Sequence, residues 1–111
     1  MKIFADEAMQ NPIDFVDFGK VPVGTKKVLP IYLYNDSDAL LTNLDYEFPS
    51  LPATEVLKVE GPVTIQPKEA SKLVLTWQPS PFFKKALKID IFIKGEEVYL
   101  AEHTYTVSEQ I

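Results

Sequence analysis

The chain has 111 residues, of which 46% are hydrophobic and 24% are charged, and its formal net charge at pH 7 is −5. This length and composition fit one globular domain with one hydrophobic core and exclude a disordered chain. Nucleic-acid-binding proteins need a basic stripe that displaces counterions from phosphates, and none is visible in a sequence with eleven lysines, no arginine and sixteen acidic residues. We therefore expect no nucleic-acid partner.

The chain has no cysteine, so no disulfide supports its fold. Near the N-terminus, Asp6 and Glu7 stand where a cleaved signal peptide has an apolar run. No stretch approaches the ~20 apolar residues of a membrane-spanning helix. These features predict a protein of the cytoplasm, or of a virion assembled there, that is not inserted in a membrane.

Two glycines mark the first strands. Phe18-Gly19 predicts a kinked strand, because glycine supplies a positive φ or room for a neighbouring backbone. We expect Val21-Pro22-Val23 to form a short edge strand, since proline cannot donate a ladder hydrogen bond, and Gly24 to form the turn after it. Residues 1–11 are expected to form an arm, either loose or with one helical turn.

A long strand over residues 27–35 follows, and its apolar side chains alternate with the period of a half-buried strand. A corner of short polar side chains at residues 35–38 ends it, because such side chains cap backbone N–H groups. Alternation predicts core-facing side chains in this strand and the later ones, namely Leu29, Ile31, Leu33, Leu73, Leu75, Trp77, Leu87, Ile89, Ile91 and Ile93.

Gly95-Glu96 predicts a tight hairpin turn, after which residues 97–107 return as the last strand. Turn signals recur about every 8–12 residues, and no segment has helical periodicity of useful length. The expected fold class is therefore all-β: a single immunoglobulin-like antiparallel β-sandwich of about seven strands. We expect it over residues 12–107, between an arm over 1–11 and a tail over 108–111.

Several of these parts keep the order that they have in a known family. Phe18-Gly19, Val21 and Gly24 precede the long strand with its corner at Asn35-Asp36-Ser37, and Ile65-Gln66-Pro67 feeds a strand that ends in Trp77-Gln78-Pro79. Residues 12–102 thereby resemble the ASH/MSP-type immunoglobulin-like domains, named after proteins of cilia and centrosomes and the nematode major sperm protein. The resemblance implies a sandwich that binds other proteins. Lone domains of this kind are also similar to small phage virion proteins.

Catalytic and metal sites find little support in the sequence. His103 is the only histidine, so a Ser-His-Asp or Cys-His mechanism would need it, yet no turn nearby offers a nucleophile. Asp36 and Asp38, with Asp14 and Asp17, carry oxygens suited to Ca²⁺, but they lack the spacing of a dedicated loop and a capping turn explains the corner. We expect no enzyme activity, no metal and no cofactor.

Aromatic side chains on the expected outer faces are the candidate binding residues, because large aromatic groups outside a small core form interaction surfaces. With the histidine among them, the candidates are Tyr32, Tyr34, Phe82, Phe83, Phe92, Tyr99, His103 and Tyr105. The alternative is that a loop or the N-terminal arm covers them. Open strand edges are a second route to binding, because a partner can add a strand there.

The sequence as a whole favours a non-enzymatic protein-binding structural module, a small component of a larger assembly such as a capsid-decorating, neck or tail protein of a virion. Its partners are expected to be other proteins, including copies of itself. An intracellular adaptor of the ASH/MSP kind is one alternative, although Lys26-Lys27 and Lys84-Lys85 make only a small basic surface for phospho-motifs. A carbohydrate-binding module is another, less favoured alternative.

Overall fold

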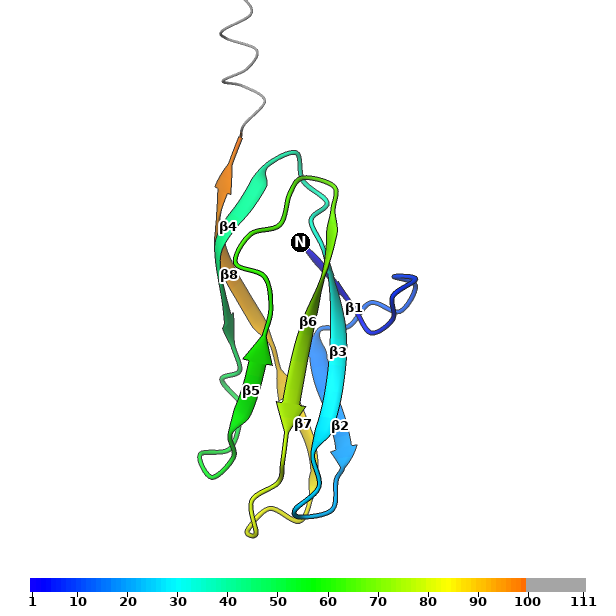
Figure 1. The fold of residues 1–111 in the computed structure, drawn as a ribbon, viewed down its shortest axis with the longest axis vertical. Coiled ribbons are helices and arrows are strands. Elements are labelled where there is room, and N and C mark those ends of the chain that lie inside the picture. The colour runs from blue at the N-terminus through cyan, green and yellow to red at the C-terminus, as the bar shows by residue number, and fades with distance from the viewer. Residues whose placement is uncertain (100–111) are drawn as a thin grey trace, which may run out of the picture.

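The computed structural model describes residues 1–99, which form β-strands and no helix (Figure 1). The strands are β1 (Lys2–Phe4), β2 (Phe15–Lys20), β3 (Lys27–Tyr34), β4 (Leu40–Glu47), β5 (Leu57–Glu60), β6 (Ala70–Trp77), β7 (Ala86–Asp90) and β8 (Phe92–Val98). Every strand pair is antiparallel. The described part of the chain is therefore all-β, as the alternation of the sequence predicts.

The strands form three sheets. One has four strands in the order β1-β3-β6-β5, and the other two are the pairs β2-β7 and β4-β8. β7 and β8 follow each other along the chain with only Ile91 between them, so the extended chain changes its pairing partner from β2 to β4 at Ile91. An isolated bridge between Leu41 and Ile65 ties the β5–β6 connection to β4.

The core lies between the four-stranded sheet and the β2-β7 pair. Its buried side chains come from both, mainly β2, β3, β6 and β7, and are Val16, Phe18, Val21, Ile31, Leu33, Ile65, Leu73, Leu75, Trp77, Leu87, Ile89 and Ile91. Leu29 and Ile93 are only partly buried against this cluster. Burying one such side chain contributes roughly 1.5–3 kcal/mol, so the predicted inward faces supply most of the hydrophobic stabilisation.

The kink at Phe18-Gly19 is a β-bulge. The Asp17 carboxylate accepts a hydrogen bond from the Gly19 N–H at 2.8 Å, and Gly19 has φ +67°. The β2–β7 register shifts between Asp17 and Gly19, which leaves Phe18 as the extra residue with its side chain in the core. Glycine takes this left-handed conformation without steric cost, so the sequence prediction of a glycine kink is confirmed.

The expected short strand Val21-Pro22-Val23 is absent from the structure. β2 ends at Lys20, and the Thr25 N–H donates to the Pro22 carbonyl at 3.1 Å across a turn. Gly24 has φ +84°, the value that the third residue of a type II turn requires. The prediction of a strand was wrong because proline and valine suit the first half of this turn as well as an edge strand.

The expected hairpin turn at Gly95-Glu96 was also wrong. β8 runs straight through both residues and pairs with β4. A Cβ on Gly95 would lie 2.7 Å from Leu44 Cδ2 and 3.1 Å from the Thr42 carbonyl oxygen. β4 has an irregular register there, with Asn43 at φ +52°, and it presses against β8. Gly95 therefore serves the close approach of two strands.

The N-terminal residues belong to the four-stranded sheet. Lys2 pairs with Tyr34 and Phe4 pairs with Tyr32, so β1 extends this sheet beside β3. After β1, the Asp6 carboxylate accepts hydrogen bonds from the N–H groups of residues 10 and 11. A capped turn that returns to the sheet thus replaces the loose arm or helical turn expected for residues 1–11.

The polar corner after β3 is built around Asn35, which is completely buried. Its Nδ2 group donates to the carbonyl oxygens of Ala39, Ile65 and Gln66 at 2.8–3.2 Å. Its Oδ1 atom accepts from the N–H and the hydroxyl of Ser37. One side chain therefore holds the β3–β4 corner against the β5–β6 connection, and the prediction of a capping turn is confirmed.

Candidate functional site

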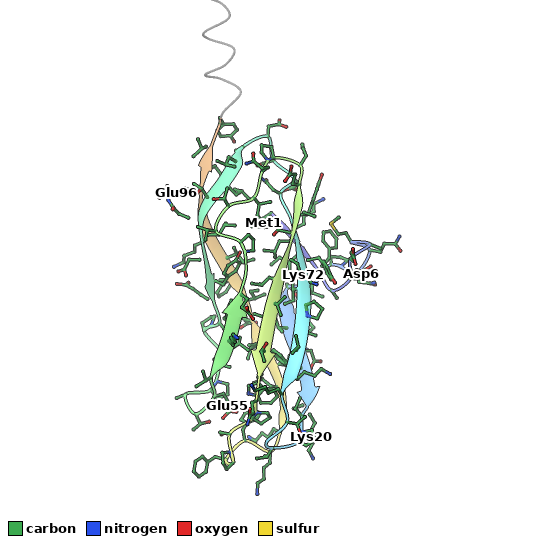
Figure 2. All side chains as sticks on the ribbon, in the orientation of Figure 1. Met1, Asp6, Lys20, Glu55, Lys72 and Glu96 are labelled. Atoms are coloured by element: carbon green, nitrogen blue, oxygen red, sulfur yellow. The ribbon has the colours of Figure 1, made fainter. Side chains whose placement is uncertain are left out.

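Three loops lie together at one end of the molecule, and we call this region the loop end. It consists of residues 20–27, 48–56 and 78–85, which link β2 to β3, β4 to β5 and β6 to β7. Figure 1 shows the three loops at the lower end of the view. Figure 2 labels Lys20 and Glu55 in this region.

Trp77, the last residue of β6, is the core residue against which the loop end packs. The strand register pairs it with Lys27 of β3 and Leu57 of β5, so all three strands reach the same level. Its ring is fully buried and makes edge-to-face contacts with Phe18 and Phe83, at centroid distances of 5.6 and 5.5 Å. Such aromatic pairs contribute about 0.5–1.5 kcal/mol beyond the area they bury.

Glu55 joins two of the loops through a buried carboxylate, only 5% exposed. Its Oε1 atom accepts from Trp77 Nε1 at 3.1 Å and from the Ser80 N–H at 3.0 Å. Its Oε2 atom accepts from the Ser80 hydroxyl at 2.6 Å and from the Thr54 hydroxyl at 2.8 Å. These hydrogen bonds fix loop 48–56 to loop 78–85.

Desolvation raises the pKa of Glu55, but the hydrogen bonds from Ser80, Thr54 and Trp77 outweigh it and hold the pKa below its ordinary value. The carboxylate is therefore ionised at neutral pH. A general acid or base must exchange protons near the working pH and be open to the substrate. Glu55 has neither property, and its role is to clamp the two loops.

Phe82 and Phe83 are neighbours with opposite surroundings. Phe83 turns inward onto the Trp77 ring, while Phe82 turns outward and is 85% exposed. The Phe83 N–H donates to the Ser80 carbonyl at 3.1 Å, which closes the turn that presents Phe82. Of this predicted pair, the structure places only Phe82 on the surface.

Other apolar side chains of the loop end are exposed as well. Val56 is 79% exposed and Val23 is 45% exposed. Val56 directly follows Glu55, and Phe82 lies two residues after Ser80, so the Glu55–Ser80 hydrogen bonds hold the two apolar side chains at the same end. The loop end therefore exposes a phenylalanine and a valine on clamped loops, and the exposure of these apolar side chains to water is unfavourable.

The loop end is also rich in lysine. Five of the eleven lysines lie in the loop end, namely Lys20, Lys26, Lys27, Lys84 and Lys85. All five are exposed, and within residues 1–99 none of them forms an ion pair. The only acidic residue in the three loops is Glu55, whose charge is buried. The loop end is thus positively charged on a chain whose net charge is −5.

Sequence reasoning missed two residues of the loop end, the buried Glu55 and the exposed Val56. Both lie in the loop before β5, which begins at Leu57. The pairs Lys26-Lys27 and Lys84-Lys85 are visible in the sequence, but nothing local shows that they meet. A buried glutamate and an exposed valine reverse the usual burial of these residue types, so no sequence signal could have found them.

The tyrosines predicted on β3 lie away from the loop end. Tyr32 and Tyr34 are half-buried, and β1 runs beside them through the pairs Phe4–Tyr32 and Lys2–Tyr34. The N-terminal residues therefore flank these two side chains. This agrees with the alternative that the N-terminal arm covers aromatic side chains on the outer faces.

The other predicted aromatic residues are spread along β8 and beyond it. Phe92 is 55% exposed beside an open groove lined by Met1 and Ile91, and Tyr99 is 47% exposed with its hydroxyl donating to Glu97 at 3.1 Å. Phe92 and Tyr99 are seven positions apart in the sequence, which is about 23 Å along an extended strand. His103 and Tyr105 lie outside the described residues. The structure therefore does not gather Phe92 and Tyr99 on one surface.

Comparison of the chain with protein-family models, with curated proteins and with solved structures finds no match. Within residues 1–99, no helix has the length and apolar character needed to cross a membrane. In the same part of the chain, no three histidine, cysteine or acidic side chains come together as metal ligands would. The loop end is the candidate site that the geometry itself offers.

Proposed function

We propose that the protein is a non-enzymatic structural module that binds another protein through its loop end. The observation that carries the proposal is the 85% exposure of Phe82 on a loop that Glu55 holds in place. Aromatic side chains are enriched at the centres of protein interfaces, and polar or charged residues form the rims. Phe82 with Val56 supplies such a centre, and the lysines of the loop end supply the rim.

The clamp favours binding because it lowers the entropy lost when the surface is covered. A flexible loop loses about 0.5–1.5 kcal/mol for each rotamer-rich side chain that an interface orders. Here Ser80 and Thr54 already bind Glu55, and Phe83 already packs on Trp77. The backbone that carries Phe82 is therefore arranged before the partner arrives.

A protein partner is favoured over a carbohydrate. Sugar-binding platforms present flat aromatic rings beside polar groups that bind hydroxyls. In the loop end, Phe83 is turned against Trp77, and the exposed side chains that share this end with Phe82 include Val23, Val56 and five lysines. This composition suits an apolar and acidic protein surface.

The finer architecture is also a proposal: the three sheets together form an immunoglobulin-like sandwich of the ASH/MSP kind. The Gly19 bulge, the Asn35 corner and the buried Trp77 support it, since each lies at a position of the family's sequence pattern. We propose further that the assembly is a virion, with a capsid-decorating, neck or tail role. An intracellular adaptor is the alternative context, and both use the same surface.

Site-specific photocrosslinking tests the binding role. A photoreactive phenylalanine analogue replaces Phe82 in one version of the full chain and Lys72, an exposed residue of β6, in the control version. We expect position 82 to form a defined crosslink to a protein in the cells that make the chain, and position 72 to form none. Equal crosslinking from both positions, or none from position 82, would contradict the proposal.

A further inference from the structure

The charges of the molecule are separated between its two ends. Opposite the loop end, the β3–β4 corner, the start of β6 and the end of β8 meet, because Tyr34 pairs with Ala70 and Leu40 pairs with Val98. We call this region the acidic end. Its acidic residues are Asp36, Asp38, Glu69, Glu96 and Glu97, against Lys2, Lys68 and the N-terminal amine, which pairs with Asp36. Figure 2 labels Glu96 toward this end and Lys20 at the other.

Within residues 1–99, most acidic groups of this end are exposed to solvent. The side chains of Asp38, Glu69, Glu96 and Glu97 are exposed. The single ion pair of Asp38, with Lys68, is 3.8 Å long between exposed side chains, and exposed pairs of this kind contribute only about 0–1 kcal/mol. Tyr99 adds an exposed aromatic ring beside Glu97. Each copy thus carries a basic, apolar surface and an acidic surface with an aromatic ring.

We propose that the partner of the loop end is the acidic end of a second copy of this chain, so that copies associate head to tail. The inference rests on the proposed function and names its partner. Lys84 and Lys85 face the acidic groups of the next copy, and Phe82 is covered in the contact. The contact is heterologous, because it joins two different surfaces, so repetition gives a ring or an open filament.

Charge complementarity is the argument for this occupant. Matched potentials speed the encounter of two surfaces, and like charges placed against each other suppress wrong pairings. Two loop ends would repel each other, and so would two acidic ends, which leaves head to tail as the favoured arrangement. The Debye length is about 8 Å at physiological ionic strength, so the association is expected to weaken as salt increases.

The test uses two variants of the full chain, each with one end disabled. Variant one carries F82S, K84E and K85E, and variant two carries D38K and E69K. All five side chains are exposed, and circular dichroism with a thermal melt checks that both variants fold. A milder pair, K84Q with K85Q, replaces variant one if its fold is lost.

Sedimentation velocity at low salt gives the decisive readings. We expect the natural chain to form species larger than a dimer as its concentration increases, and each variant alone to stay monomeric, with affinity lowered at least about tenfold. A mixture of the two variants should form a dimer and nothing larger, because one intact basic end meets one intact acidic end. High salt should dissociate that dimer.

Other results overturn the inference. A monomeric natural chain, a mixture that does not dimerise, or a variant two that assembles like the natural chain would each do so. Binding of the loop end to vesicles of anionic lipid or to RNA, with no self-association, would assign it to another occupant. If photocrosslinking from position 82 captures a different protein while the chain stays monomeric, the self-association inference is wrong and the proposed protein-binding role stands.

Discussion

Each end of the molecule is organised by one buried polar side chain, yet the two ends treat their surfaces differently. Asn35 at the acidic end and Glu55 at the loop end both have all their hydrogen-bonding atoms occupied by the chain itself. Around Asn35, Asp36 pairs with the N-terminal amine at 3.1 Å and accepts a bond from Lys68 at its carbonyl. Around Glu55, the neighbouring lysines have no such partners within residues 1–99.

At both ends, the comparison separates the buried groups of the scaffold from the exposed groups that a partner can contact. Buried polar groups must be satisfied within the fold, because leaving one unpaired costs about 1–3 kcal/mol. Exposed groups carry no such requirement, since water satisfies them. The loop end is rigid inside, while its exposed side chains are apolar or are lysines without an ion pair within residues 1–99, so it is suited to a partner. Variants of the buried and of the exposed residues can test this distinction.

The largest effect is expected at Asn35. Replacing it with Ala leaves the Ala39, Ile65 and Gln66 carbonyls without their shared donor and removes the acceptor of Ser37. We expect the free energy of unfolding, measured by urea denaturation, to fall by roughly 3 kcal/mol. The control S37A removes only the hydrogen bonds of the Ser37 hydroxyl and should lower the free energy of unfolding by about 1 kcal/mol. Equal losses in the two variants would show that Asn35 does not organise the corner.

A smaller effect is expected at Phe83, with Phe82 as a matched control one residue away. F83A removes the ring that packs on Trp77, and because Phe83 is only partly buried we expect a loss of about 2 kcal/mol. F82A should change the free energy of unfolding by no more than about 0.5 kcal/mol, since its ring contacts mainly water. A destabilising F82A would mean that Phe82 belongs to the scaffold and would remove it from the binding surface.

The smallest effect, and the one with a pH signature, is expected at Glu55. E55Q keeps the shape of the side chain but loses its charge, and should cost about 1 kcal/mol at neutral pH. The folded chain holds the pKa of Glu55 below that of the unfolded chain, so the unfolded chain takes up this proton first as the pH falls. The stabilisation from the carboxylate is therefore fully present above the ordinary pKa and is lost as the pH falls through the lowered one.

Urea denaturation of the natural chain and E55Q between about pH 7 and pH 3 measures this. The difference in unfolding free energy should stay constant above about pH 5 and narrow toward pH 3. Asp6 and Asp36, whose pKa values are also lowered, are present in both proteins and cancel in the difference. A difference that does not change with pH would mean that the charge of Glu55 plays no part in the clamp.

The sequence by itself determined the all-β class, most of the core and two of the turns. Period-two alternation is a local property, so Ile31, Leu33, Leu73, Leu75 and Trp77 could be assigned to the core without knowing which strands pair. The Gly19 bulge and the Asn35 corner depend on residues within a few positions of each other. Local chemistry was sufficient for these features.

The tertiary structure alone decided which exposed groups share a surface. Ser80 binds Glu55 across 25 positions of the sequence, and Leu57 pairs with Trp77, so these contacts together bring Val56 and Phe82 to one end. Gly95 likewise allows close contact with β4, which is distant in the sequence. The local sequence Gly95-Glu96 therefore suggested a turn where none exists. Strand pairing sets these neighbours through hydrogen bonds between segments far apart in the chain. Local periodicity carries no information about such contacts, so the candidate site emerged only from the folded structure.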